Sequence, residues 1–121
     1  MQGFGDLEAA IMDRLWDWDH AATVREMLND LAQERRLAYT TVMTVMGILH
    51  GKGVLRREKH GRAWRYWPAE TKAEHDARLM AEVLRSGRDH QLTIRRFLER
   101  VSEDEMASLR RAVFSADRAA S

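Results

Sequence analysis

The side chains with the clearest chemical use in this sequence are a group of threonines followed by a cluster of basic residues. Thr40, Thr41 and Thr44 lie in one stretch with helical spacing. A threonine hydroxyl can bond to a phosphate or a base edge, and its methyl group can contact the methyl group of thymine. Residues 52–65 contain six Lys and Arg against one Glu, a local balance of +5 that suits a polyanion. These residues indicate nucleic-acid binding, and an ordinary solvated surface is the alternative.

The charge of the whole sequence identifies no partner. The 121 residues include 20 Lys and Arg against 19 Asp and Glu, a net charge of +1. Residues 6–34 contain eight acids and two bases, a local balance of −6. The basic side chains at 52–65 could therefore pair with these acids instead of binding an external anion.

The other reactive residue types form no catalytic or metal-binding pattern. The five His residues have neither His-x-x-x-His nor Glu-x-x-His spacing, and the sequence contains no Cys and no nucleophile elbow. Gly51-Lys52-Gly53 is far too short for a phosphate-binding loop. We therefore expect no enzymatic activity, no metal and no cofactor.

Three helices and a hairpin are predicted to position the threonines and the basic cluster. The first helix covers residues 6–18, the second opens at Thr23, where Thr23-Val24-Arg25-Glu26 fits a capping box, and the third covers residues 39–50. Residues 54–58 and 63–67 are rich in β-branched and aromatic side chains, which predicts a β-hairpin with a basic tip at 59–62.

This order of elements predicts a winged helix-turn-helix, in which the third helix enters the DNA major groove and the hairpin rests on the backbone. If Val42 faces the core, Thr40, Thr44, Gly47 and Gly51 face away from it, flanked by Met43, Thr41 and Ile48. The aromatic residues Trp64, Tyr66 and Trp67 could be a stacking platform for single strands, but we favour Trp64 and Tyr66 packing on the helices. The predicted DNA-binding residues are Tyr39, Thr40, Thr41, Met43, Thr44, Lys52, Lys59 and Arg62.

The sequence after Pro68 predicts three more helices with apolar faces, too few to bury those faces alone. A second copy of the chain is the simplest partner. We expect a mainly α (α+β) fold with a winged-helix DNA-binding domain at 1–69, including a two-stranded wing, and a helical dimerisation region at 70–121. The predicted dimerisation residues are Leu79, Met80, Val83, Leu84, Ile94, Phe97, Leu98, Val101, Met106, Leu109 and Val113.

The sequence resembles the penicillinase repressor family. The resemblance is carried by residues 37–46 (LAYTTVMTVM), by Lys52-Gly53-Val54-Leu55 and by residues 61–66 (GRAWRY). Leu7-Glu8, Trp16 and the capping box at Thr23 add to it. It implies a bacterial winged-helix repressor of β-lactamase or related stress genes, dimeric through its C-terminal helices. It also implies release from DNA by proteolytic cleavage after a membrane sensor detects a β-lactam.

The sequence departs from the family pattern at two places. Gly47-Ile48-Leu49 stands where many members have Thr-Arg-Leu, so a charge is absent from the reading face. Arg96-Phe97 stands where the β-lactam branch has its cleaved Asn-Phe bond. The absence of Cys also excludes the Cys motif of the copper-responsive branch.

The expected partners are therefore double-stranded DNA with a pseudo-palindromic operator, a second copy of the chain and, through the resemblance, a regulatory protease. No run approaches 18 apolar residues and the N-terminal residues lack a signal sequence, so we expect no membrane association and a cytoplasmic location. The alternative function is a winged-helix interaction module that dimerises without binding DNA.

Overall fold

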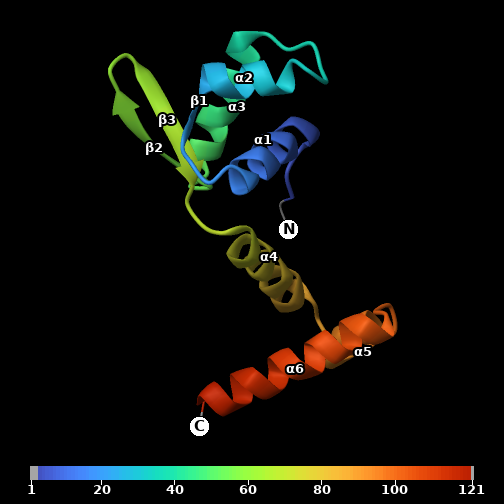
Figure 1. The fold of residues 1–121 in the computed structure, drawn as a ribbon. Helices are drawn as coiled ribbons and strands as arrows, with labels where there is room; N and C mark the ends of the chain where they lie inside the picture. The colour runs from blue at the N-terminus through green and yellow to red at the C-terminus, as the bar shows by residue number, and fades with distance from the viewer. Residues whose placement is uncertain (1–2, 121) are drawn as a thin grey trace. The chain divides into compact units, whose positions relative to one another are not determined.

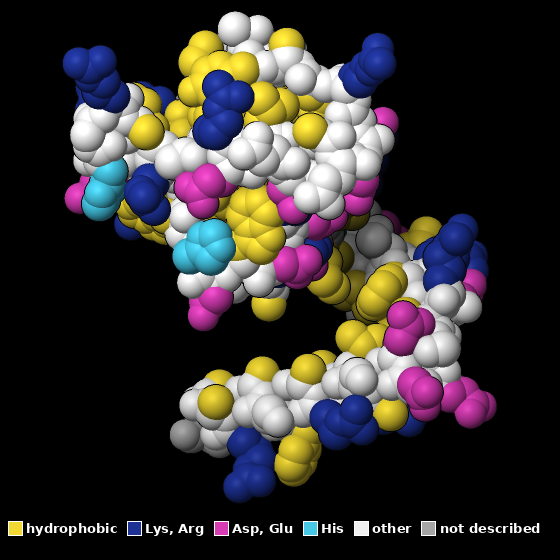
Figure 2. All heavy atoms as spheres, turned by 45° about the horizontal axis from the view of Figure 1, so that its top comes forward, with side chains coloured by type: hydrophobic (Ala, Val, Ile, Leu, Met, Phe, Trp, Pro, Cys, Tyr) yellow, Lys and Arg dark blue, Asp and Glu magenta, His cyan; other side chains and the backbone are white. Residues whose placement is uncertain are grey.

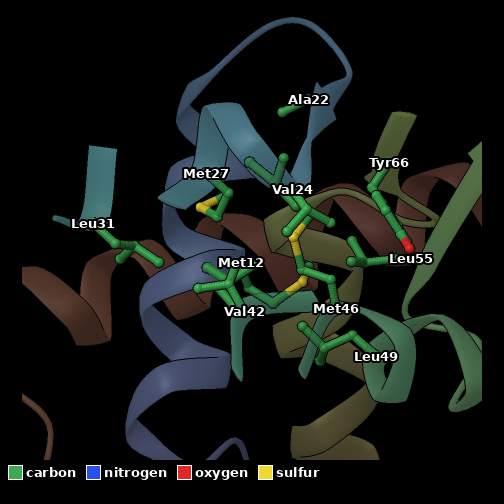
Figure 3. Close-up of a cluster of buried hydrophobic side chains, with 12 residues drawn as sticks. Met12, Ala22, Val24, Met27, Leu31, Val42, Met46, Leu49, Leu55 and Tyr66 are labelled. Atoms are coloured by element: carbon green, nitrogen blue, oxygen red, sulfur yellow. The ribbon is translucent and has the colours of Figure 1, made fainter. Parts of the chain in front are cut away.

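Three helices with apolar faces meet in one core. They are α1 (Asp6–Asp17), α2 (Val24–Leu31) and α3 (Tyr39–Gly51) (Figure 1). The structure is a computed structural model that describes residues 3–120. Their buried positions recur at helical spacing, which is why each helix has one core face. Figure 3 shows this cluster, which comprises Ile11, Met12, Leu15, Ala22, Val24, Met27, Leu31, Val42, Met46, Leu49, Leu55 and Tyr66.

Local hydrogen bonds fix where α2 begins and how it sits against α1. Glu26 N–H donates to Thr23 Oγ1 and Thr23 N–H donates to the Glu26 carboxylate, each at 3.1 Å, which confirms the predicted capping box. The Arg14 guanidinium of α1 bonds to Asp30 and, at 3.0 Å, to Glu34. Two of the eight acids at 6–34 therefore have an ion-pair partner in α1.

The hairpin consists of β2 (Leu55–His60) and β3 (Ala63–Pro68), which pair antiparallel. The loop is only Gly61-Arg62, shorter than the predicted tip at 59–62, and Gly61 has φ +62°, a conformation that favours glycine in two-residue hairpin turns. A further strand, β1 (Ala22–Thr23), pairs with β3 to give the order β1-β3-β2. No sequence pattern predicts β1, because two residues are too few to show alternation.

Three helices follow the hairpin, as expected: α4 (Lys72–Ser86), α5 (His90–Leu98) and α6 (Glu103–Ala120). Capping boxes open α4 at Thr71 and α6 at Ser102, and the Asp89 carboxylate accepts from Leu92 N–H at 3.0 Å at the start of α5. Val101, which was expected to lie in the same helix as Ile94, falls in the connection after α5. None of the helices formed by residues 3–120 is long and apolar enough to cross a membrane.

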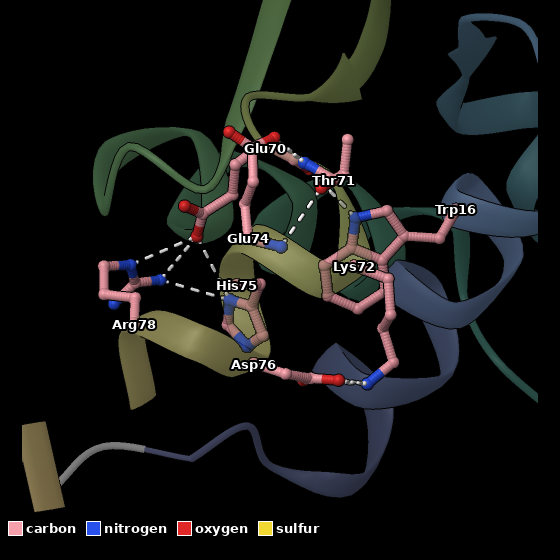
Figure 4. A network of polar contacts seen from close by, with 8 residues as sticks. All are labelled: Trp16, Glu70, Thr71, Lys72, Glu74, His75, Asp76 and Arg78. Carbon is pink, nitrogen blue, oxygen red and sulfur yellow. Dashed lines mark hydrogen bonds and ion pairs between the residues drawn. The ribbon is translucent and has the colours of Figure 1, made fainter. Parts of the chain in front are cut away.

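The chain divides into two compact units, Met1–Leu79 and Met80–Ser121, with the division inside α4. The first turns of α4 belong to the first unit because they pack on α1 (Figure 4). His75 is buried and stacks on Phe4 with ring centroids 4.7 Å apart, and Trp16 Nε1 donates to the Glu70 carbonyl at 3.0 Å. The functional boundary predicted at 69/70 stays a prediction, ten residues before the division between the compact units.

Candidate nucleic-acid interface

The exposed face of α3 is uncharged and offers free hydroxyl groups. Val42, Met46 and Leu49 bury the opposite face, which leaves Thr40, Thr41 and Thr44 exposed. Among the described residues, no hydrogen bond engages these three hydroxyls. Tyr39, Met43 and Ile48 are exposed beside them at 39%, 44% and 47%. This face can therefore offer hydroxyl donors and acceptors together with apolar surface, the two chemistries that read base edges in a major groove.

Gly47 lies in the interior of α3, where glycine costs conformational entropy. A Cβ atom added there would meet no atom within 4 Å, so packing within the described chain does not require glycine. The missing side chain lowers the helix surface beside Thr44 and Ile48, which permits close approach of another molecule to the α3 backbone.

Arg25 is a charged neighbour of α3 that the list of predicted binding residues omitted. Its guanidinium carbon lies 4.8 Å from the centroid of the Tyr39 ring at the start of α3. Arg25 is the second residue of α2 and is exposed. The sequence signal was its position in the first turn of the helix that precedes the reading helix.

The wing carries the exposed positive charge. Arg56, Lys59, Arg62 and Arg65 are all exposed, and none of them forms an ion pair with a described residue. Pairing with the acidic helices, the alternative considered for this charge, therefore does not occur at these four positions. Figure 2 shows Lys and Arg side chains projecting from separate places on the first unit, with hydrophobic side chains exposed between them.

Lys52 differs from the other predicted DNA-binding cations. Its Nζ atom lies 2.9 Å from Glu8 Oε2, so the residue after α3 is tied to the start of α1. The hydrogen bond from Lys52 is the main reason that the pKa of Glu8 lies below its ordinary value, and the Gly5 N–H bond acts in the same direction. At this one position the alternative of pairing with the acidic helices applies.

Trp16 and Trp18 belong to the structure of the first unit rather than to a ligand cage. Trp16 and Trp18 pack against the core, and Tyr66 is 2% exposed within it. Trp64 does not pack on the helices as expected, because it lies nearer the tip of the wing and is 38% exposed. Among residues 3–120, no group of three or more His, Cys, Asp or Glu side chains could hold a metal ion.

The second unit exposes the apolar side chains predicted to form a dimer. No described residue of 80–120 is buried. Met80, Val83, Ile94, Phe97 and Val113 are 41–67% exposed. The other predicted positions, Leu79 at the end of the first unit and Leu84, Leu98, Val101, Met106 and Leu109 in the second, are half-buried.

Leu92 and Phe114, at 42% and 63% exposure, extend this apolar surface and were missed by the sequence analysis. Neither residue lies three or four positions from Ile94 or Val113, so helical spacing from those two residues does not assign it to the apolar face. Leu98, Met106 and Phe114 line a groove between α5 and α6. Figure 2 shows hydrophobic side chains in a row along α6.

The chain is similar to known transcriptional regulators. The sequence profile of the penicillinase repressor family matches residues 4–114. The transcriptional regulator BlaI of two strains of Mycobacterium tuberculosis, CDC 1551/Oshkosh and ATCC 25618/H37Rv, is 42% identical over 112 residues, which cover 90% of this chain and 81% of each relative. A solution structure of the DNA-binding domain of the repressor BlaI matches with a TM-score of 0.53 and 23% identity, over 61% of this chain and 93% of that domain. That structural match supports the predicted winged-helix fold of the first unit.

Proposed function

Because the chain belongs to the penicillinase repressor family, a family of transcriptional repressors, we propose that it represses transcription as a homodimer bound to a pseudo-palindromic DNA operator. The family consists of repressors and not of enzymes, so the expectation of no enzymatic activity is confirmed. A repressor acts where its DNA is, which supports a cytoplasmic location.

One observation carries the proposal: the uncharged, hydroxyl-bearing face of α3 is followed in the chain by a wing whose exposed cations lack acidic partners among the described residues. Neutral hydroxyl and methyl groups can read base edges, whereas cations supply most of the binding to backbone phosphates. The two chemistries are divided between two elements in the way that a winged helix uses them.

Each element then has its own role on the duplex. In the proposal, Thr40 and Thr44 face base edges, while Tyr39, Thr41 and Met43 lie at the margins of the reading surface. Lys59 and Arg62 on the wing bind phosphates, and Lys52 does so when it leaves Glu8. Ile48 is uncharged where many family members have Arg, so base recognition depends on hydroxyl and methyl contacts rather than on a cation that binds guanine.

Dimerisation is proposed through the second unit, whose apolar side chains have no core of their own to enter. Burial of such surface is the main favourable term in association between chains. A two-fold dimer presents two copies of α3, so the half-sites of the operator should lie about 10 bp apart or a multiple of that distance.

Loss of the dimer is the proposed route to release from DNA. Separating the two heads removes the effective-concentration advantage of the second head, about 10²–10⁴ in affinity. A regulatory protease is a proposed partner on this route, with Arg96-Phe97 as the first bond to inspect. This bond lies within α5, where Arg96 pairs with Glu99 at 3.0 Å, so cleavage requires α5 to unwind locally.

The test is binding of the full chain to mixed-sequence duplex DNA over a range of salt concentrations. We expect steep salt dependence, and Arg62→Ala should weaken binding to all sequences alike and reduce the slope of log K against log salt by about 0.9. Binding without salt dependence would show that the wing does not contact the DNA backbone. No binding at all, with dimers intact, would favour the module that dimerises without DNA.

A further inference from the structure

The wing has two faces of different composition. Side chains alternate along β2 and β3, so Leu55, Arg57 and Lys59 share one face with Tyr66 and Trp64. Leu55 and Tyr66 are buried at the base of this face. Arg57, Lys59 and Trp64 form the part of this face beyond the buried base, and we call these three residues the inner wing face. The opposite face places Glu58 directly across from Arg65 and is therefore mixed in charge.

Trp64 is the centre of the inner wing face. Its cross-strand partner is Lys59, whose Nζ lies 5.6 Å from the centroid of the indole, and the guanidinium carbon of Arg57 lies 4.2 Å from that centroid. Arg57 also approaches the Tyr66 hydroxyl, with Nη1 3.4 Å from the oxygen. Both cations are attracted to the electron-rich face of the ring.

No acidic group among residues 3–120 neutralises this cluster. Neither Arg57 nor Lys59 forms an ion pair with a described residue, and the acid of β2, Glu58, lies on the opposite face. Trp64 is 38% exposed, so its ring is accessible to both cations. Its closest charged neighbours are the two cations, and restricting their motion before DNA arrives lowers the entropy that binding would cost.

We propose that Trp64 is a positioning residue of the wing, which holds Arg57 and Lys59 together on the inner wing face so that both meet the phosphate backbone. The inference rests on the proposed DNA binding and adds to it two residues, Trp64 and Arg57, that the predicted binding set omitted. The indole itself need not touch DNA.

The test compares Trp64→Leu, which keeps an apolar side chain without a ring, with Trp64→Phe, which keeps a ring. The probe is a mixed-sequence duplex of about 30 bp, three turns of the double helix, because backbone contacts operate without the operator sequence. We expect Trp64→Phe to bind close to wild type. Trp64→Leu should bind more weakly, by up to about 30-fold, because preorganisation by two exposed cation–π contacts cannot gain more than the free energy of those contacts.

The slope of log K against log salt separates positioning from a purely structural role. Loss of two phosphate contacts in Trp64→Leu should reduce the slope by up to about 1.8. Lys59→Gln should weaken binding by the wild-type chain but have a much smaller effect in the Trp64→Leu background. The matched control is Arg65→Gln on the opposite face, whose effect should be the same in both backgrounds.

The outcomes are distinguishable. Equal affinity and slope for wild type and Trp64→Leu would overturn the inference while leaving the proposed function standing. The same conclusion would follow if Lys59→Gln and Arg65→Gln each weakened binding equally in the wild-type and Trp64→Leu backgrounds. Equal loss in Trp64→Leu and Trp64→Phe, with a lowered melting temperature in both, would assign Trp64 to wing stability alone. A wild-type chain that binds no duplex would overturn the proposed function and the inference together.

Discussion

Replacing Glu8 by Gln should make the free protein slightly less stable and the DNA complex stronger. Glu8 holds Lys52 at 2.9 Å, and the two side chains are 18% and 49% exposed. Because Lys52 is half exposed, the ion pair contributes about 0.2–1 kcal/mol to the free energy of unfolding. Gln has nearly the same shape, and its amide oxygen can still accept from Gly5 N–H, which bonds to Glu8 at 3.1 Å in the wild type.

The same change releases the Lys52 ammonium for a phosphate. One added phosphate contact should steepen the slope of log K against log salt by about 0.9 and raise affinity at low salt. Stability and DNA affinity therefore move in opposite directions. The assays are chemical denaturation for the first and duplex binding over a salt series for the second.

The acid limb of the stability curve gives a further check. The pKa of Glu8 is lowered in the folded protein, mainly by its hydrogen bond from Lys52, relative to an ordinary value of 4.5. A lowered carboxyl pKa stabilises the fold above the unfolded-state pKa, and this contribution is lost as the pH falls through the folded-state pKa. Glu8→Gln should therefore flatten stability against pH below about 4.5.

Unchanged DNA affinity and salt slope in Glu8→Gln would show that the released Lys52 does not contact a phosphate. Lys52 would then serve only to join the residue after α3 to the start of α1, and it would leave the set of DNA-binding residues.

Three other substitutions test the remaining elements. Thr44→Ala should change the preferred sequence at one base pair by about 1–3 kcal/mol, measured with singly substituted operators, and a uniform loss over all operators would place Thr44 on the backbone instead. Gly47→Ala should raise the free energy of unfolding by about 1 kcal/mol, because its Cβ meets open space, yet weaken operator binding; unchanged binding would show that DNA does not approach the α3 backbone there. Phe97→Glu should yield monomers by sedimentation and lower operator affinity by about 10²–10⁴, and persistent dimers would move the interface away from α5.

The sequence could predict the elements that rest on local patterns. The capping box at Thr23 involves two residues only three positions apart. The core face of α3 follows from the spacing of Val42, Met46 and Leu49. Both depend on interactions within a single helix turn or two, so neighbouring sequence contains the necessary information.

Contacts between distant segments could not be predicted in this way. The pairing of β1 with β3 joins Ala22 to Tyr66, and the ion pair of Lys52 joins it to Glu8, 44 residues earlier. The boundary near Pro68 was set by local composition, whereas the stacking of His75 on Phe4 carries the first unit into α4. Such pairs are selected by tertiary packing, and no local periodicity specifies them.

Selecting the genomic fragments that the full chain binds would show whether a dimer reads DNA with two copies of α3. We expect enrichment of one inverted repeat whose half-sites are centred about 10 bp apart or a multiple of that distance, with both half-sites protected by the bound protein. Recovery of fragments without a shared motif, or of a single unrepeated half-site bound by an intact dimer, would contradict it.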